Sequence, residues 1–391
     1  MKRLSVCIFT IAIALFCVVS CRNSSSRKAV LPTPDPIEEA LSAMTLREKV
    51  GQLFCVRPES FDVTLQWEDN DQLAAFQVQD VNERMHRVNA QYPVGGIIVF
   101  AHNIKDPGQL LALTDSLHAF NGSPLLYIDE EGGRVARIAN NPAFNVPKYR
   151  SMSAIGNTGD PAKAYECGHT IGQYLKQYGF DVDLAPVADV NTNPRNPVIG
   201  PRAFSDKPEV AAKMVVKYLE GLKDAGIAGC VKHFPGHGDT QADTHFGYAQ
   251  SGKTWEEMLG CEMVTFRAAI QADVPLIMTA HIAAPKVTGS SIPSTLSEVV
   301  LQEKLRKELG YKNVIITDGM AMGAITRHYK PGEAAVKSLQ AGADIILGPK
   351  NFIEAFDAVM AAVADSTLTE ERIDESVRRV LQLKQKVKRA F

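Results

Sequence analysis

The sequence predicts an α/β fold, a single (β/α)8 barrel of the TIM type. From residue 37 onward, short apolar runs alternate with helical segments, several of which stop at glycine, and ionisable residues stand where the apolar runs end. Parallel strands covered on both faces have this apolar character, and eight β/α units suit a chain of 391 residues. The eight predicted strands are 52–57, 94–100, 124–129, 180–190, 227–234, 274–281, 313–320 and 343–349.

The segments between these strands have helical patterns. Residues 161–179, 208–226 and 296–310 each end in glycine, which is typical of a helix C-terminus. Residues 37–54 predict one amphipathic helix leading into the first strand, and a further helix is expected around 71–90. A doubly wound open sheet is the alternative fold, although no G-x-G-x-x-G or Walker motif supports nucleotide binding. No second catalytic domain is expected.

The first residues are expected to lie outside the barrel. The chain begins with the positively charged stretch MKR, and an apolar run follows over 4–19 that is short for a membrane span. These features predict a lipoprotein signal peptide over 1–20. The residues up to Cys21 resemble a bacterial lipobox, which implies cleavage before Cys21 and lipidation of its thiol. A flexible tether over 21–36 and the barrel domain over 37–391 follow. The expected location is the cell envelope, on a membrane anchor and facing the periplasm or the surface; a plain signal peptide is the alternative.

Charge and cysteine content exclude several other classes of protein. The formal net charge is −2, so no basic excess indicates a nucleic-acid partner. Beyond the signal, four widely spaced cysteines without a C-x-x-C pair remain: Cys55, Cys167, Cys230 and Cys261. This pattern predicts neither a disulfide framework nor a zinc knuckle. We expect a monomer without a cofactor.

Ionisable residues stand at the ends of five successive predicted strands. They are Asp129, Asp189, Lys232 with His233, His281 and Asp318. Catalytic groups of TIM barrels lie at the carboxyl ends of the strands. Packing alone does not explain polar residues at five such positions, so they predict an active site.

The segment KHFPGHGDTQADTHFG, residues 232–247, is unusually rich in histidine. His233 and His237 have the spacing of zinc ligands on a helix, but Pro235 and Gly236 between them break a helix. Zinc could still bind an irregular loop. The available ligands would then be His233, His237, Asp239, Asp243 and His245.

Proton transfer is the alternative use of this loop. Residues two apart in an extended segment point to the same side, so Asp243 can accept a hydrogen bond from His245. That bond fixes the tautomer and leaves the second ring nitrogen to move a proton. His237 is then expected to hold the shape of the loop. Asp318, at the end of an apolar strand, must be hydrogen-bonded or functional because an unpaired buried charge is costly; its alternative role is to cap the next helix.

Three motifs carry a family resemblance. KHFPGHGDTQADTH, IDEEGGRVAR (128–137) and ITDGMAMGAI (316–325) resemble glycoside hydrolase family 3, and in particular its bacterial β-N-acetylglucosaminidases. The resemblance covers roughly residues 40–391. Other branches of the family lack the long histidine loop and take their acid/base carboxylate from a second domain.

The resemblance implies roles residue by residue. Asp318 matches the nucleophile, His245 the general acid/base and Asp243 its orienting partner. Thr244 departs from the pattern, where serine is expected, but keeps the hydroxyl. The residues that match the sugar-binding positions are Asp129, Arg137, Arg202, Lys232 and His233.

The implied activity is exo-acting, retaining release of terminal N-acetylglucosamine from β-linked glycans such as peptidoglycan fragments. A histidine base, unlike a carboxylate, does not repel an anionic acceptor, so phosphorolysis is one alternative. A metal-dependent barrel hydrolase and a non-catalytic sugar-binding lipoprotein are two others. No metal and no cofactor are expected.

Overall fold

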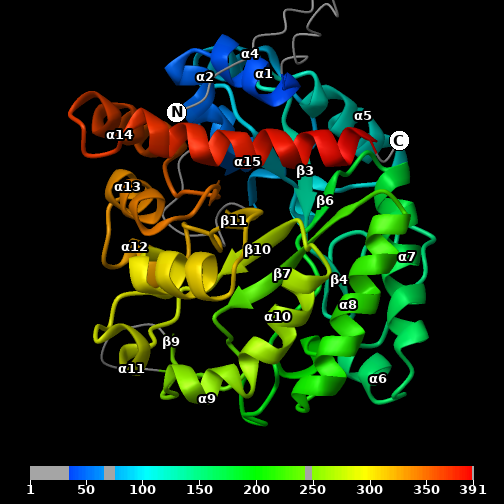
Figure 1. Ribbon diagram of the computed structural model, residues 1–391. Helices are drawn as coiled ribbons and strands as arrows, with labels where there is room; N and C mark the ends of the chain where they lie inside the picture. Colours follow the sequence, from blue (N-terminus) through cyan, green and yellow to red (C-terminus); the bar gives the residue numbers. More distant parts are fainter. Residues whose placement is uncertain (1–34, 66–74, 243–248, 390–391) are drawn as a thin grey trace, which may run out of the picture. The chain divides into compact units, whose positions relative to one another are not determined.

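Eight parallel strands form one sheet in the order β11-β10-β7-β6-β3-β2-β1-β12. A bridge between Ile316 and Ile345 joins the two edges, so the sheet closes and the predicted barrel is confirmed. The computed structural model describes residues 35–65, 75–242 and 249–389 (Figure 1). The strands are β1 (Phe54–Val56), β2 (Gly96–Ile98), β3 (Leu125–Ile128), β6 (Val182–Asp183), β7 (Ala228–Phe234), β10 (Leu276–Thr279), β11 (Val314–Ile316) and β12 (Ile346–Leu347).

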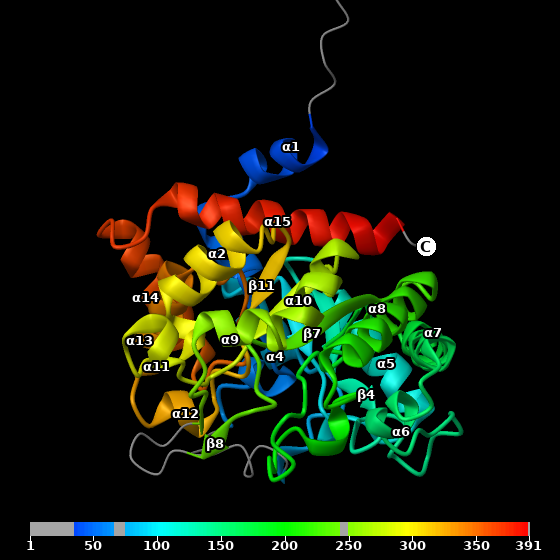
Figure 2. The same ribbon diagram turned by 60° about the horizontal axis from the view of Figure 1, so that its bottom comes forward.

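Helices surround this sheet (Figures 1 and 2). The longer ones are α1 (Pro36–Ala43), α4 (Glu83–Gln91), α5 (Pro107–His118), α7 (Pro161–Gln177), α8 (Pro208–Asp224), α10 (Glu262–Gln271), the π-helical η5 (Val299–Glu308), α13 (Pro331–Ala341), α14 (Phe352–Ala364) and α15 (Glu370–Arg389). The shorter ones are α2 (Leu46–Gln52), α6 (Met152–Gly156), α9 (Trp255–Leu259), α11 (Pro285–Thr288), α12 (Gly323–Thr326) and the 3-10 turns η1 (Pro58–Phe61), η2 (Ala101–Asn103), η3 (Gly200–Arg202) and η4 (Ser294–Leu296).

The helix α15 closes the amino-terminal end of the barrel (Figure 1). Its Val380, Leu383 and Val387 join the buried cluster that fills the barrel interior. Lys384 donates to the carbonyl of Gly122, which lies just before β3, at 2.7 Å. Because α15 covers this end, the carboxyl ends of the strands are the ones left for a site.

Two predicted elements differ from the structure. Residues 37–54 do not form one helix, because Thr45 caps α2: its hydroxyl accepts from the N–H of Glu48, and the Glu48 carboxylate accepts from the N–H of Thr45. The strand predicted over 180–190 is also too long. Only Val182–Asp183 is strand, and Pro186, which has no N–H to give to the ladder, interrupts the run before an isolated bridge at Val187.

Other predictions fall partly on residues outside the described part. The helix expected around 71–90 overlaps residues 66–74, which are not described, and α4 begins at Glu83 behind the side-chain cap of Asn82. Cys55, Cys167, Cys230 and Cys261 are free thiols. In the described ranges, no helix has the length and apolar character needed to cross a membrane. Cys21, the predicted lipidation site, lies outside those ranges.

Candidate functional site

A buried ion-pair network occupies the carboxyl ends of β3 and β7. The Lys232 amino group lies 2.8 Å from Oδ1 of Asp129 and 2.7 Å from Oε1 of Glu131. Arg137 donates to Oδ2 of Asp129 at 3.2 Å. The Lys232 side chain is only 3% exposed, so these charges interact with little screening by water.

Arg202 extends the network toward β7. Its Nε and Nη2 donate to the two carboxylate oxygens of Glu131 at 2.9 and 2.7 Å, the bidentate geometry in which arginine binds carboxylates best. The same Nη2 lies 3.4 Å from Nε2 of His233. Three segments distant in sequence, 129–137, 202 and 232–233, are therefore joined through side-chain contacts.

The network keeps its carboxylates charged. Burial alone would raise the pKa of Glu131, but Lys232 and Arg202 lower it to about 2. Burial would likewise raise the pKa of Asp129, but Lys232 and Arg137 hold that pKa well below its usual range. Burial would lower the pKa of Lys232, yet the two carboxylates raise it above its ordinary value. All three groups are thus ionised at neutral pH.

His233 is fixed from both sides. Its Nδ1 lies 2.7 Å from Oδ2 of the buried Asp189, which accepts the proton on that nitrogen. Arg202 can only donate, so Nε2 of His233 must be the acceptor. Oδ1 of Asp189 also accepts the backbone N–H of His237 at 2.6 Å. His233 therefore presents an acceptor nitrogen in a fixed orientation.

The hairpin of β4 (Glu130–Gly132) and β5 (Val135–Ala136) positions Arg137. The Glu130 carboxylate points away from the network and accepts the backbone N–H groups of Arg137, Ile138 and Ala139 at 2.5 to 2.9 Å. Tyr174 donates to the same carboxylate at 2.8 Å. This buried turn holds the backbone from which Arg137 reaches Asp129.

Asp318 follows β11 in a turn that His281 supports. Nε2 of His281 donates to the carbonyl of Gly319 at 3.0 Å, and its Nδ1 lies 2.9 Å from the Thr295 hydroxyl. Burial lowers the pKa of His281, so it remains neutral while it makes these bonds. The N–H of Gly319 donates to Oδ1 of Asp318 at 2.7 Å. Asp318 is partly exposed, unlike the strand that carries it.

The histidine loop leaves β7 and returns through a short hairpin. Strands β8 (Gln241–Ala242) and β9 (Ala249–Gln250) pair antiparallel, and the predicted acid/base pair Asp243 and His245 falls between them, outside the described residues. Nδ1 of His237 lies 2.6 Å from the Thr240 hydroxyl, which is consistent with a role in the shape of the loop.

Two glycines of this loop are needed for close packing. A Cβ on Gly238 would lie 1.9 Å from the carbonyl oxygen of Val190. A Cβ on Gly236, whose φ is +125°, would lie 2.3 Å from Cγ of Glu262. The stem of the loop is therefore seated tightly against its neighbours.

The structure thus brings together most of the residues that the sequence predicts. Asp129, Arg137, Arg202, Lys232 and His233 form one continuous network. Glu131 was not predicted, although it lies at its centre. Its place two residues after Asp129, directly beyond a strand end, is the signal that could have indicated it.

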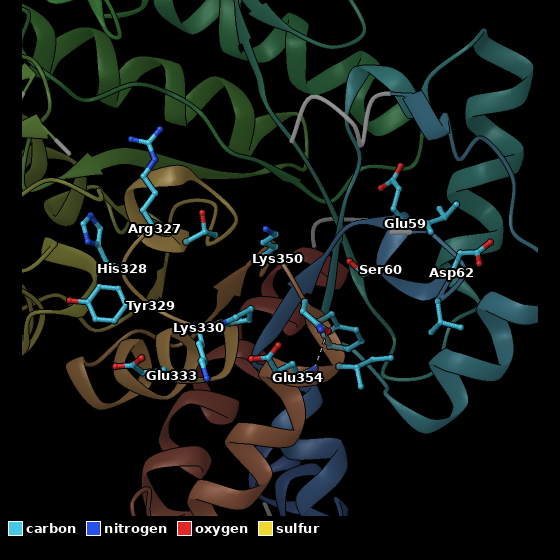
Figure 3. A pocket seen from close by; sticks show the side chains of 17 residues that line it. Glu59, Ser60, Asp62, Arg327, His328, Tyr329, Lys330, Glu333, Lys350 and Glu354 are labelled. Atoms are coloured by element: carbon cyan, nitrogen blue, oxygen red, sulfur yellow. Dashed lines mark hydrogen bonds between the residues drawn. The ribbon is translucent and has the colours of Figure 1, made fainter. Parts of the chain in front are cut away.

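A cavity of about 1140 Å³ is lined by residues from three segments, 59–65, 326–333 and 350–354 (Figure 3). Lys350 lies between the segment Arg327–Lys330 on one side and Glu59–Asp62 on the other. Arg57, next to that second segment, stacks its guanidinium 4.9 Å from the centre of the Phe100 ring, and Arg137 stacks 5.7 Å from the same ring. Phe100 thus contacts both Arg57 and Arg137, although no residue of the Asp129 network lines the cavity itself.

Among the described residues, no group of three or more His, Cys, Asp or Glu side chains is arranged to hold a metal ion. Asp243 and His245 lie outside these residues. The metal alternative thus rests on residues outside the described ranges.

A closed barrel with ionisable groups gathered at the carboxyl ends of its strands defines a protein of the TIM-barrel enzyme type. The model of the glycosyl hydrolase family 3 N-terminal domain matches residues 45–383. The chain belongs to this family.

The chain is similar to several named relatives. It is 34% identical to "Beta-hexosaminidase A" of Pseudoalteromonas piscicida, over 76% of this chain and 54% of that one. It is 36% identical to "Beta-hexosaminidase" of Thiobacillus denitrificans, over 68% of this chain and 74% of that one. A solved family 3 β-N-acetylglucosaminidase from Paenibacillus sp. superposes with a TM-score of 0.76 at 38% identity, over 88% of this chain and 63% of that one. The chain thus spans little more than half of the Pseudoalteromonas protein.

Proposed function

We propose that this chain is an exo-acting, retaining β-N-acetylglucosaminidase that releases terminal N-acetylglucosamine from β-linked glycans such as peptidoglycan fragments. The observation that carries the proposal is the ionised network of Asp129, Lys232, Glu131 and Arg202 at the same end of the barrel as a partly exposed Asp318. Membership of the family and the printed names of the relatives support it.

In this proposal the network binds the terminal sugar. Ionised donors and acceptors form the stronger class of hydrogen bonds, and a sugar hydroxyl can give to Asp129 while it accepts from Lys232 or Arg137. His233, held between Asp189 and Arg202, fixes the position of Arg202 beside this site. Because these groups are already oriented by one another, little ordering remains when the sugar binds.

Asp318 then acts as the nucleophile. Its carboxylate attacks the anomeric carbon, the bond to the leaving oxygen breaks, and a glycosyl-enzyme forms. His245, oriented by Asp243, gives its proton to the leaving oxygen and afterwards takes one from the water that releases the sugar. His281 holds the Gly319 carbonyl and so keeps the Asp318 turn in place.

The location is part of the same proposal. A chain lipidated at Cys21 would be anchored to a membrane of the cell envelope. Mass spectrometry of the N-terminal peptide tests this: we expect an acylated Cys21 at the N-terminus. A peptide cleaved elsewhere, with an unmodified thiol, would contradict the anchor.

Release of nitrophenol from 4-nitrophenyl N-acetyl-β-glucosaminide tests the activity. We expect steady release by the purified chain with excess EDTA, and free N-acetylglucosamine as the product with or without phosphate. Release only after zinc is restored would favour the metal-dependent alternative, and a sugar phosphate in the presence of phosphate would favour the phosphorylase. No release under any of these conditions would contradict the proposed activity.

A further inference from the structure

A second polar cavity, of about 420 Å³, lies beside the β4–β5 hairpin. We call it the arginine cavity, because Arg134, Arg150 and Arg202 line it from three separate segments. Its other polar side chains are Ser151, Ser153 and Asn157, and the rest of the wall consists of glycine, alanine and proline. No carboxylate is among the residues that line it, whereas Glu59, Asp62, Glu333 and Glu354 line the cavity of Figure 3.

Two of the three guanidinium groups are held close to one another. Nη2 of Arg134 donates to the carbonyl of Val198 at 2.7 Å, and Nη1 of Arg202 donates to the same oxygen at 3.1 Å. Like charges repel at such separations. Glu131 offsets the charge of Arg202, but no carboxylate of the described residues pairs with Arg134. The arrangement therefore favours an additional anion in the cavity.

The neighbouring carboxylates are already balanced by other cations. Three acidic and three basic side chains make up the sugar-site network: Asp129, Glu131 and Asp189 with Arg137, Lys232 and Arg202. Arg134 and Arg150 come in addition to these and form no ion pair with any other residue of the described ranges. The cavity thus keeps the positive charge of two guanidinium groups.

We propose that the arginine cavity binds a tetrahedral oxyanion, either sulfate or phosphate. The planar fork of arginine matches such groups with paired hydrogen bonds. The guanidinium groups of Arg134 and Arg150 can bind in this way, and Arg202, whose fork is taken up by Glu131, adds its charge at the side of the cavity. The Ser153 hydroxyl and the Asn157 amide supply neutral donors in the same wall. The oxyanion is either free in solution or an ester group on a glycan.

The cavity shares Arg202 with the sugar site. Arg202 binds Glu131 and approaches His233, so an oxyanion held by this arginine acts on the two groups next to the sugar. This part of the inference rests on the proposed function. Occupation of the cavity is then expected to change KM for the glycoside and to leave kcat nearly unchanged, because Asp318 lies at the end of another strand.

Isothermal titration with sodium sulfate, at an ionic strength held constant with sodium chloride, tests the site directly. We expect saturable binding to the unaltered chain and at least about tenfold weaker binding to Arg150→Gln, which removes one charged partner. Arg150 is exposed, so the substitution should preserve the fold, and the melting temperature without sulfate checks this. Arg150→Lys, which keeps the charge but loses the fork, should bind with intermediate affinity.

The matched control is Arg87→Gln. Arg87 is 69% exposed on α4, and we expect its substitution to leave sulfate binding unchanged. Equal binding by the unaltered chain and Arg150→Gln, or no saturable binding at all, would overturn the site. Binding that Arg87→Gln weakens as much as Arg150→Gln would show a general salt effect and would also overturn it.

The source of the oxyanion is distinguished with a sulfated sugar. Tighter binding of N-acetylglucosamine 6-sulfate than of both N-acetylglucosamine and inorganic sulfate would support the site and indicate a group carried by the glycan. Binding no tighter than that of inorganic sulfate would support a free anion. Sulfate binding without glycosidase activity would contradict the proposed function but not this site, whereas glycosidase activity without sulfate binding would contradict this site alone.

Discussion

The two ends of the barrel each contain a buried network of charges, and the networks differ in how completely they are satisfied. At the amino-terminal end, Asp344 has no solvent exposure and accepts from Arg306, Arg379, Ser376 and the N–H of Ile315. Burial would raise the pKa of Asp344, but Arg306 and Arg379 lower it. Every oxygen of this carboxylate is used within the protein, so the network has no capacity to bind a ligand.

At the carboxyl-terminal end the groups are arranged differently. Asp129 keeps a side chain that is 15% exposed, Arg137 is 27% exposed, and Asp318 stands at a partly open turn. Similar residue types thus serve stability at one end and, in our proposal, sugar binding at the other. The comparison shows that a buried ion pair by itself does not identify a functional site. A functional site is indicated by accessible donors and acceptors whose positions are fixed by neighbouring charges.

The largest expected effect comes from Asp318→Asn. If the carboxyl-terminal end carries the chemistry, kcat should fall by at least about a thousandfold, because the amide cannot attack the anomeric carbon. The melting temperature should change little, since the side chain is partly exposed and its Oδ1 keeps an acceptor for the N–H of Gly319. Steady-state kinetics with the nitrophenyl glycoside, together with calorimetry, measures both. Retention of more than a tenth of the activity would refute the assignment of Asp318.

Asp344→Asn is the counterpart at the other end. Removing this charge leaves the largely buried Arg306 without its carboxylate and Arg379 with Glu375 alone, which should cost about 3–5 kcal/mol of unfolding free energy. The folded fraction should keep its kcat. Urea unfolding measures the unfolding free energy, and kinetics at low temperature measure kcat. A loss of kcat at unchanged stability would contradict the assignment of Asp344 to stability alone.

A smaller effect is expected for Glu131→Gln, which keeps the volume of the side chain but removes the charge shared by Lys232 and Arg202. The two cations then lose their fixed positions, and kcat/KM should fall by about 10- to 100-fold, mainly through KM. Glu166→Gln, on the exposed face of α7, is a matched control with no expected effect on either constant. A change in kcat alone would indicate that Glu131 acts on the chemical step instead.

The smallest effect concerns acid stability. The pKa of Glu131 is lowered to about 2 in the folded chain, so its ion pairs contribute stability that is complete above the ordinary pKa of about 4.5. That contribution is lost as the pH falls from there toward about 2. Unfolding free energies measured across this window should fall less steeply for Glu131→Gln than for the unaltered chain. Parallel curves would show that the pair contributes nothing to acid stability.

The sequence predicts the barrel well because its signals are local. Apolar runs indicate all eight strands. The break before α2 depends instead on the capping pair of Thr45 and Glu48. This pair is visible in the sequence, but the amphipathic pattern of residues 37–54 favours one continuous helix. Pro186 likewise interrupts the strand predicted over 180–190, although the residues around it form an apolar run.

The site is predictable only in part, for a different reason. Asp129, Lys232 and Asp318 follow strands, so the topology alone gathers them. Glu131 and the arginine cavity depend on how the β4–β5 hairpin folds back and on the contact of Arg134 and Arg202 with one carbonyl, that of Val198. Such contacts between distant segments leave no periodic trace in the sequence.

Trapping the glycosyl-enzyme tests the central claim most directly. The chain would be incubated with a fluorinated N-acetylglucosaminyl donor that forms the covalent intermediate faster than water releases it, and then digested for mass spectrometry. We predict one added sugar on the peptide that contains Asp318, and none in Asp318→Asn. A label on any other residue, or no label although nitrophenol is released, would contradict an Asp318-centred retaining mechanism.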